Sequence, residues 1–233
     1  MTILPNQFFG IGDVIFTQTL VRRIAESHGE GTKIVWGVLN HFVDGLNRAY
    51  PDITFVDYRK IPIDYERRDD YYITLPDLGD CRVLPIRWAC ENLKLPYDNC
   101  MKAKYQMYGM NFEDWRDGAM WKQDIDRCVF NTAHEKYTLV NRTFGSDGKM
   151  QVNIPKHGNE IELTNLAGFS LFDWANIIKD ATAIHTVNTS IIYLLEMLDL
   201  KAKEVHLYQR TIKGQTFENI RYLLKRHKYI FHG

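Results

Sequence analysis

Residues 2–27 read TILPNQFFGIGDVIFTQTLVRRIAES, and this stretch indicates the fold class. Its first residues, Thr2–Leu4, are short and apolar, which predicts a strand. Apolar residues recur at helical spacing from Asp13 to Ser27, so we expect a helix there. A strand, a glycine-containing loop and a helix in this order are typical of the first half of a parallel β-α-β unit.

The same alternation continues along the next 70 residues or so. Strands are predicted at Lys33–Val38, Ile53–Val56 and Tyr71–Leu75, and helices at Leu39–Tyr50 and Pro85–Leu93. Consecutive units of this kind wind with a right-handed crossover around a parallel sheet. The first part of the chain is therefore expected to be a Rossmann-like lobe.

Residues 97–134 are aromatic and charged, and we interpret them as a helical connection to a second lobe. A new alternation follows. Strands are expected at Tyr137–Asn141, Met150–Ile154, Glu160–Leu163, Ala181–His185, Glu204–Tyr208 and Tyr229–Phe231, with helices at Leu171–Lys179, Thr189–Leu198 and Thr216–Arg226. The prediction is an α/β protein of two Rossmann-like lobes, residues 1–115 and 116–233, that face each other across a cleft.

The composition is that of a globular protein without a strong charge preference. The 233 residues are 45% hydrophobic and 25% charged, and 29 basic residues balance 29 acidic ones. Zero net charge gives no support for a nucleic-acid partner. No apolar run approaches the ~20 residues of a membrane span, and the N-terminus lacks a leader pattern, so we expect a cytoplasmic protein. The four cysteines show no metal-ligand spacing, and no metal site is expected.

The first candidate site is the glycine loop that opens the first predicted helix. Gly10 and Gly12 allow the backbone to approach a ligand, and free N–H groups at a helix start favour a polar or anionic group. Ile15 stands where a dinucleotide fingerprint has its third glycine, which disfavours NAD binding. The alternative for Asp13 is an N-cap of the helix.

The second candidate site follows a buried strand of the second lobe. His185 is expected to end that strand, and the polar residues Asn188, Thr189 and Ser190 precede an apolar helix. Hydroxyl and amide side chains beside free N–H groups suit a diphosphate. The alternatives are ordinary helix capping for the three polar residues and a hydrogen-bonded strand-end histidine for His185.

The third candidate site is Asn141-Arg142-Thr143, at the end of the first strand of the second lobe. The Arg142 guanidinium can pair bidentately with a phosphate. The alternative is an exposed surface arginine.

Two of these segments resemble the GT-B glycosyltransferases, especially the lipopolysaccharide heptosyltransferase-like group. Residues 10–20, GIGDVIFTQTL, resemble that group's opening segment, G-x-G-D-hydrophobic-x-x-T-x-x-L. Residues 171–194 resemble the later helix, the strand and the D-T-G/S-x-x-H-L-A segment that receives the nucleotide. Asn188 stands in place of the usual Asp, Tyr193 in place of His, and Leu195 in place of a small residue.

The resemblance implies an inverting transfer of a sugar from a nucleotide-sugar donor to a saccharide or other hydroxyl acceptor. Asp13 would be the general base, and the second lobe would bind the donor, with Glu162 on the ribose or, alternatively, as a solvated strand residue. We expect no metal or cofactor, because no D-x-D lies at a strand end of the second lobe. The sugar class stays open among hexose, heptose and pentose. A sugar-nucleotide epimerase or hydrolase, or a non-catalytic binding module, would suit the same architecture.

Overall fold

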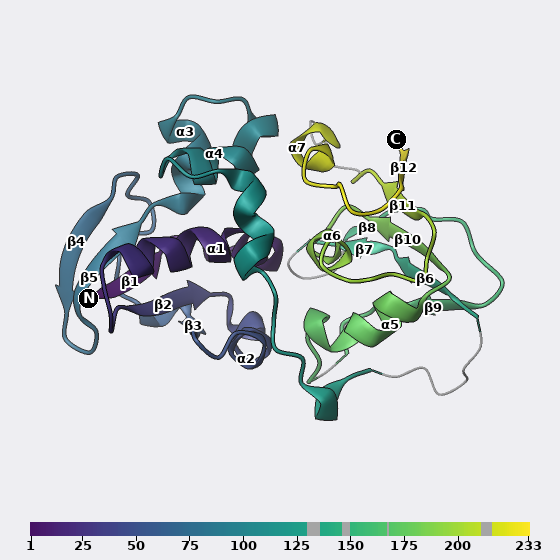
Figure 1. Cartoon of the computed structure of the whole chain (residues 1–233), viewed down its shortest axis with the longest axis horizontal. Coiled ribbons are helices and arrows are strands. Elements are labelled where there is room, and N and C mark those ends of the chain that lie inside the picture. Colours follow the sequence, from purple (N-terminus) through teal and green to yellow (C-terminus); the bar gives the residue numbers. More distant parts are fainter. Residues whose placement is uncertain (130–135, 146–149, 167, 211–215) are drawn as a thin grey trace. The chain divides into compact units, whose positions relative to one another are not determined.

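The computed structural model describes residues 1–129, 136–145, 150–166, 168–210 and 216–233 (Figure 1). The chain divides into two compact units, Met1–Lys122 and Gln123–Gly233. The boundary therefore lies after residue 122, rather than after residue 115 as the sequence suggested. No helix in the described part of the chain is long and apolar enough to cross a membrane.

The first unit is a five-stranded sheet in the order β3-β2-β1-β5-β4. Its strands and helices are β1 (Thr2–Pro5), α1 (Ile11–Ser27), β2 (Lys33–Val38), α2 (Asn40–Ala49), β3 (Thr54–Asp57), β4 (Tyr71–Leu75), β5 (Gly79–Leu84), α3 (Ala89–Asn92) and α4 (Cys100–Gln106). All neighbours are parallel except β4, which pairs with β5 in an antiparallel hairpin. The sequence did not predict the strand β5, which the structure adds to the sheet.

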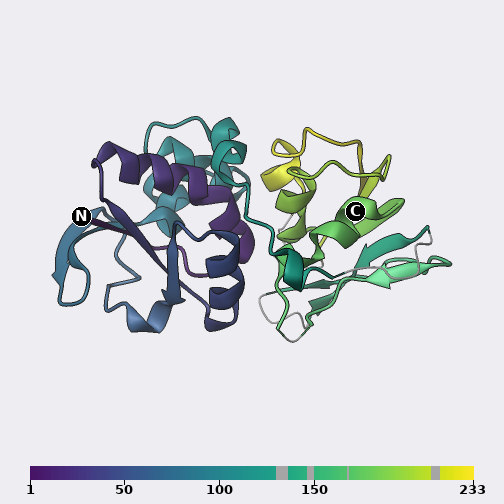
Figure 2. The ribbon, with the colours of Figure 1, turned by 60° about the horizontal axis from the view of Figure 1, so that its bottom comes forward.

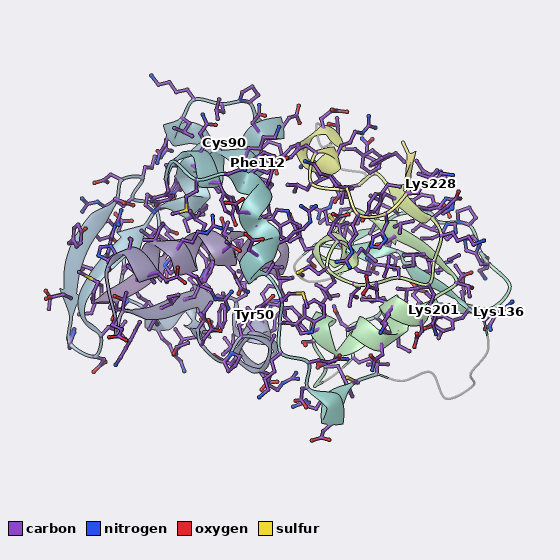
Figure 3. All side chains as sticks on the ribbon, in the orientation of Figure 1. Tyr50, Cys90, Phe112, Lys136, Lys201 and Lys228 are labelled. Atoms are coloured by element: carbon purple, nitrogen blue, oxygen red, sulfur yellow. The ribbon has the colours of Figure 1, made fainter. Side chains whose placement is uncertain are left out.

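The region after residue 97 belongs to the first unit and is not simply a connection. The Tyr105 hydroxyl on α4 donates to the Phe16 carbonyl at 2.7 Å, and the Thr19 hydroxyl donates to the Trp115 carbonyl at 2.7 Å. Both contacts hold the 100–118 region against α1, which lies beside it in Figure 1. Tyr50, marked in Figure 3, donates to the Ala119 carbonyl at 2.8 Å. Residues 130–134 of the predicted connection lie outside the described residues.

The second unit has a parallel sheet in the order β12-β11-β10-β6-β9. Its elements are β6 (Thr138–Asn141), β7 (Thr143–Phe144), β8 (Met150–Gln151), β9 (Glu160–Glu162), α5 (Ala175–Asp180), β10 (Ala183–Val187), α6 (Ile191–Leu195), β11 (Val205–Tyr208), α7 (Glu218–Arg221) and β12 (Tyr229–His232). The strand expected at 150–154 is shorter in the structure, Met150–Gln151, and it pairs with β7 in a separate two-stranded hairpin.

The two faces of the second sheet are covered differently. The helices α5 and α6 cover one face of this sheet (Figure 2). Leu139, Ile184 and Leu207 are fully buried, and the alternation of side chains along a strand puts Leu139 on the face opposite to Val140. The other face packs against the β7–β8 hairpin through Val140 and Val187. The helical face is the expected result of right-handed crossovers that all step in one direction from β9 to β12. The predicted pair of Rossmann-like α/β units is confirmed.

Candidate functional site

The glycine loop lies at the topological switch point of the first sheet. The chain runs from β1 to β2 on one side, whereas β5 neighbours β1 on the other. Asn6 joins the two strand ends, because its N–H donates to the Leu84 carbonyl at 2.8 Å and its carbonyl accepts from the Arg87 N–H at 3.1 Å. Ligands of open α/β sheets bind outside the carboxyl ends of the strands at such a point.

Gly10 is required by the local geometry of this loop. Its φ of 76° lies in the left-handed region, and a Cβ there would meet the Asp13 carboxylate Oδ2 at 2.8 Å. Gly10 is also the N-cap residue of α1, and no side chain caps that helix. The alternative that Asp13 is the N-cap is therefore wrong, since Asp13 lies within the first turn. Gly12 is buried in the same turn.

The Asp13 carboxylate is partly exposed and has a buried cation as its partner. Its side chain is 34% exposed, whereas that of Lys104 on α4 is 4% exposed. The Lys104 ammonium donates to Asp13 Oδ1 and, at 3.0 Å, to Gln7 Oε1. Sequence reasoning missed both partners, because the burial of Lys104 between Ala103 and Tyr105 is visible only in the folded chain.

Aromatic rings and a cation surround the same loop. Phe8 stacks on Tyr58 at 4.4 Å between ring centroids, and Phe9 is 45% exposed. The Arg87 guanidinium lies 5.2 Å from the Phe8 centroid and 5.4 Å from the Phe9 centroid. Phe8 is buried, so Phe9 is the exposed ring of this pair, and Arg87, which lies over both rings, is also ion-paired with Glu66 at 3.2 Å.

In the second unit, the switch point lies between β6 and β10, and polar side chains meet there. The Asn141 amide donates to the Thr186 hydroxyl at 3.0 Å and to the Thr189 hydroxyl at 3.1 Å. Asn141 and Thr186 are register partners on neighbouring strands, and both are buried. The structure therefore brings together two predicted residues, Asn141 and Thr189, and adds Thr186.

The segment after β10 is held through the backbone of its first residue, and all three of its polar residues are partly exposed. The Asn188 N–H donates to the Tyr208 carbonyl at 3.0 Å, and its carbonyl accepts from the Arg210 guanidinium. Asn188, Thr189 and Ser190 are partly exposed. Ser190 is the N-cap of α6 but makes no side-chain capping bond. Arg210 is a cation at this edge that sequence reasoning missed.

Arg142 is not an exposed surface arginine, so that alternative is wrong. Its side chain is 16% exposed and forms ion pairs with Glu160 at 3.0 Å and Glu162 at 3.2 Å. The hydrogen bond from Arg142 lowers the pKa of Glu160, and Glu160 in turn raises the pKa of Arg142. Glu162, at the end of β9, is 40% exposed, and its carboxylate is paired with Arg142. Thr143 begins the hairpin, opposite Gln151.

His185 lies inside β10, with Val187 ending the strand, so its predicted place at the strand end is wrong. Its ring stacks on His206 at 4.3 Å and lies 4.0 Å from the His157 ring, and its Nδ1 lies 3.0 Å from the Tyr208 hydroxyl. Burial, followed by the neighbouring imidazoles, lowers the pKa of His185 to about 4. His185 is therefore neutral at pH 7.

No protein-family model matches the chain, and no curated protein matches it either. Among solved structures, the bacterial iron-containing dodecameric glycosyltransferase TibC from enterotoxigenic E. coli H10407 is similar, with a TM-score of 0.57 and 10% identity. A second TibC structure, described as a heptosyltransferase in complex with ADP-D-beta-D-heptose, gives a TM-score of 0.54 and 10% identity. Both matches cover 100% of this chain and 62% of the TibC chain. A family 9 glycosyl transferase from Veillonella parvula has a TM-score of 0.46 at 6% identity, over 99% of this chain and 86% of that one.

This chain spans less than two thirds of the TibC length. TibC contains iron, whereas in the described ranges of this chain no group of three or more His, Cys, Asp or Glu side chains is arranged to hold a metal ion. The similarity covers both units and their order along the chain. This chain therefore has the fold of the glycosyltransferase TibC, in agreement with the GT-B-like architecture expected from its sequence.

Proposed function

We propose that this protein is a glycosyltransferase that moves a sugar from a nucleotide-sugar donor to a hydroxyl acceptor. The observation that carries the proposal is the partly exposed carboxylate of Asp13, which lies beside a glycine loop at the switch point of a GT-B-like unit. A fixed carboxylate at that point suits general-base catalysis. The similarity to TibC supports the fold on which the proposal rests.

In the proposed reaction, the acceptor oxygen attacks the anomeric carbon while Asp13 takes the hydroxyl proton. The bond between the anomeric carbon and the diphosphate oxygen breaks, and the electron pair leaves with the nucleotide. Attack opposite the leaving group inverts the anomeric centre. Asp13 has about a third of its side chain exposed, so a substrate hydroxyl can approach it.

The second unit is proposed to bind the donor at the polar edge formed by Asn141, Asn188, Thr189 and Ser190. Arg210 lies at the same edge through its bond to the Asn188 carbonyl, and a guanidinium there would offset charge on a diphosphate. Such charge stabilisation lowers the barrier to leaving-group departure without requiring a metal ion, and metal independence is part of the proposal.

The remaining predicted donor contacts keep a place in the proposal with altered roles. Arg142, already paired with Glu160 and Glu162, would contribute as a fixed ion-pair network beside the donor. Glu162, whose side chain is 40% exposed, would contact the ribose hydroxyls. His185 is neutral and lies within β10, so it would support the donor site through the packing of that strand and not through its charge.

The test begins with a thermal-shift screen of ADP, UDP, GDP, CDP and their sugars. ADP-linked sugars come first, because TibC is described in complex with ADP-D-beta-D-heptose. A donor at 100 times its Kd should add ~2.7 kcal/mol of stability. A panel without any stabilising nucleotide would overturn the donor site.

Transfer is then followed by mass spectrometry with the identified donor and an acceptor panel. Asp13→Asn removes the base, so kcat should fall ~10²–10⁴-fold while donor affinity changes little. Asp44→Asn is the matched control, because Asp44 is a 73% exposed carboxylate on α2 of the same unit. Wild-type turnover by Asp13→Asn would reject the role of Asp13. Product without any acceptor would indicate an epimerase or hydrolase, and binding without turnover a binding module.

A further inference from the structure

Lys104 is a buried cation whose position the fold alone does not explain. Its side chain is 4% exposed, and its ammonium contacts Asp13 Oδ1 and Gln7 Oε1. Lysine is almost never buried unless it is paired, because removing an ammonium from water is expensive. An apolar side chain of similar length would fill the same space without this desolvation cost.

The helix that carries Lys104 is held rigidly against α1. The neighbouring Tyr105 is fully buried, and its hydroxyl donates to the Phe16 carbonyl at 2.7 Å. Ala103, on the other side of Lys104, is also fully buried. The ammonium therefore approaches the glycine loop from a fixed backbone that lies 91 residues after Asp13 in the chain.

The ammonium controls both the carboxylate and the loop beside it. It bonds Oδ1 of Asp13, while Oδ2 lies against Gly10, whose missing Cβ leaves the room for it. The second acceptor, Gln7, uses its amide N–H to bond the Phe9 carbonyl at 2.8 Å. Lys104 thus connects α4 to the glycine loop through the Gln7 side chain, and it contacts the Asp13 carboxylate directly.

We infer that Lys104 is the positioning residue of Asp13: it holds the carboxylate in one orientation, with Oδ1 occupied, so that Oδ2 is the oxygen that receives the acceptor proton. This inference rests on the proposed function for the identity of the step. Lys104 is 4% exposed and acts through Asp13 in this inference, without contacting the substrate itself. A salt bridge needed only for stability would matter for unfolding and would leave turnover in the folded enzyme unchanged.

The first experiment needs no substrate. Urea unfolding is measured for the wild-type protein, Lys104→Met, Asp13→Asn and the double variant, because a double-mutant cycle isolates the pair. The unfolding equilibrium constants should show a coupling of at least tenfold, or about 1.4 kcal/mol. The control cycle replaces Lys104→Met with Lys102→Met and keeps Asp13→Asn. Lys102 lies on the same helix, and its Nζ lies 5.3 Å from the ring centroid of Phe112, which is marked in Figure 3. Additive effects in the Lys104 cycle would overturn the pairing.

The second experiment separates positioning from stability. In folded Lys104→Met, kcat should fall at least tenfold with the donor KM unchanged, whereas Lys102→Met should keep the wild-type kcat. Lys104→Ala should regain activity with ethylammonium and not with ethanol, because only the former restores the cation. Wild-type kcat in Lys104→Met, or equal effects of the two additives on Lys104→Ala, would overturn the inference. Absence of turnover in the wild-type protein with every donor would instead reject the proposed function, and the unfolding cycle would still decide the pairing.

Discussion

We predict that the second unit loses stability in mild acid, because a buried histidine stacks on another in its sheet. His185 stacks on His206, and burial with the adjacent imidazoles lowers its pKa from 6.5 to about 4. The unfolded chain therefore binds one more proton than the folded chain between these two values. Stability from this group is fully present above pH 6.5 and is lost as the pH falls from 6.5 towards 4.

The size of the effect follows from the same two pKa values. Each pH unit over which the unfolded chain binds one extra proton lowers the free energy of unfolding by about 1.4 kcal/mol. The loss is therefore about 2 kcal/mol at pH 5 and about 3 kcal/mol at pH 4. His185 is 9% exposed as a residue, so solvent screening reduces this figure little. His206, with its own pKa lowered by burial and by His232, adds to the loss in the same direction.

The assay is amide hydrogen exchange of β10 and β11 by mass spectrometry, corrected for the intrinsic rate at each pH. In the wild-type protein, the free energy of opening should be about 2 kcal/mol lower at pH 5 than at pH 7.5. His185→Gln keeps a neutral group near the Tyr208 hydroxyl and should remove most of this difference. His41→Gln, at an exposed position of the first unit, is the control and should retain it. The same pH dependence in His185→Gln as in the wild-type protein would refute the reasoning.

Three further predictions concern single side chains. Gly10→Ala places a Cβ at a φ of 76° and 2.8 Å from the Asp13 carboxylate, so it should cost about 1–2 kcal/mol of stability and lower kcat; a calorimetric Tm equal to that of the wild-type protein would contradict this. Glu196→Ala removes a carboxylate that is 1% exposed and accepts the Lys225 N–H at 3.1 Å, so urea unfolding should show a loss of about 2–4 kcal/mol; a loss below ~0.5 kcal/mol would refute the role of this carboxylate. Arg142→Ala removes the cation that pairs with Glu160 and Glu162 and leaves these two carboxylates unpaired beside the proposed donor site, so isothermal titration should show nucleotide binding weakened by about 1.5–3 kcal/mol; an unchanged Kd would remove Arg142 from the donor site.

Some structural features were predictable because they depend on neighbours in the chain. The helix after Gly10 begins two residues before its predicted start and ends as predicted at Ser27. The strand Lys33–Val38 has the predicted bounds. In both cases local periodicity and burial agree, so short-range information is sufficient.

Other elements differ from their predictions because distant partners decide them. The strand β5 lies between β1 and β4, and its pairing with β1 joins residues almost 80 positions apart. The helices α6 (Ile191–Leu195) and α7 (Glu218–Arg221) are shorter than the predicted helices at 189–198 and 216–226, because periodicity alone does not fix where a helix ends. The boundary between the units lies at Lys122, later than the predicted residue 115, because the 100–118 region packs on α1.

The sequence by itself determined the α/β class, the two units and the positions of Asp13, Asn141 and Thr189 at strand or helix ends. These follow from residue type and spacing, which act over a few positions along the chain. Only the tertiary structure decided that Lys104 is the partner of Asp13 and that Arg142 is paired with two carboxylates. Charges pair according to distance in space and to the cost of burying them, and neither quantity exists until the chain has folded.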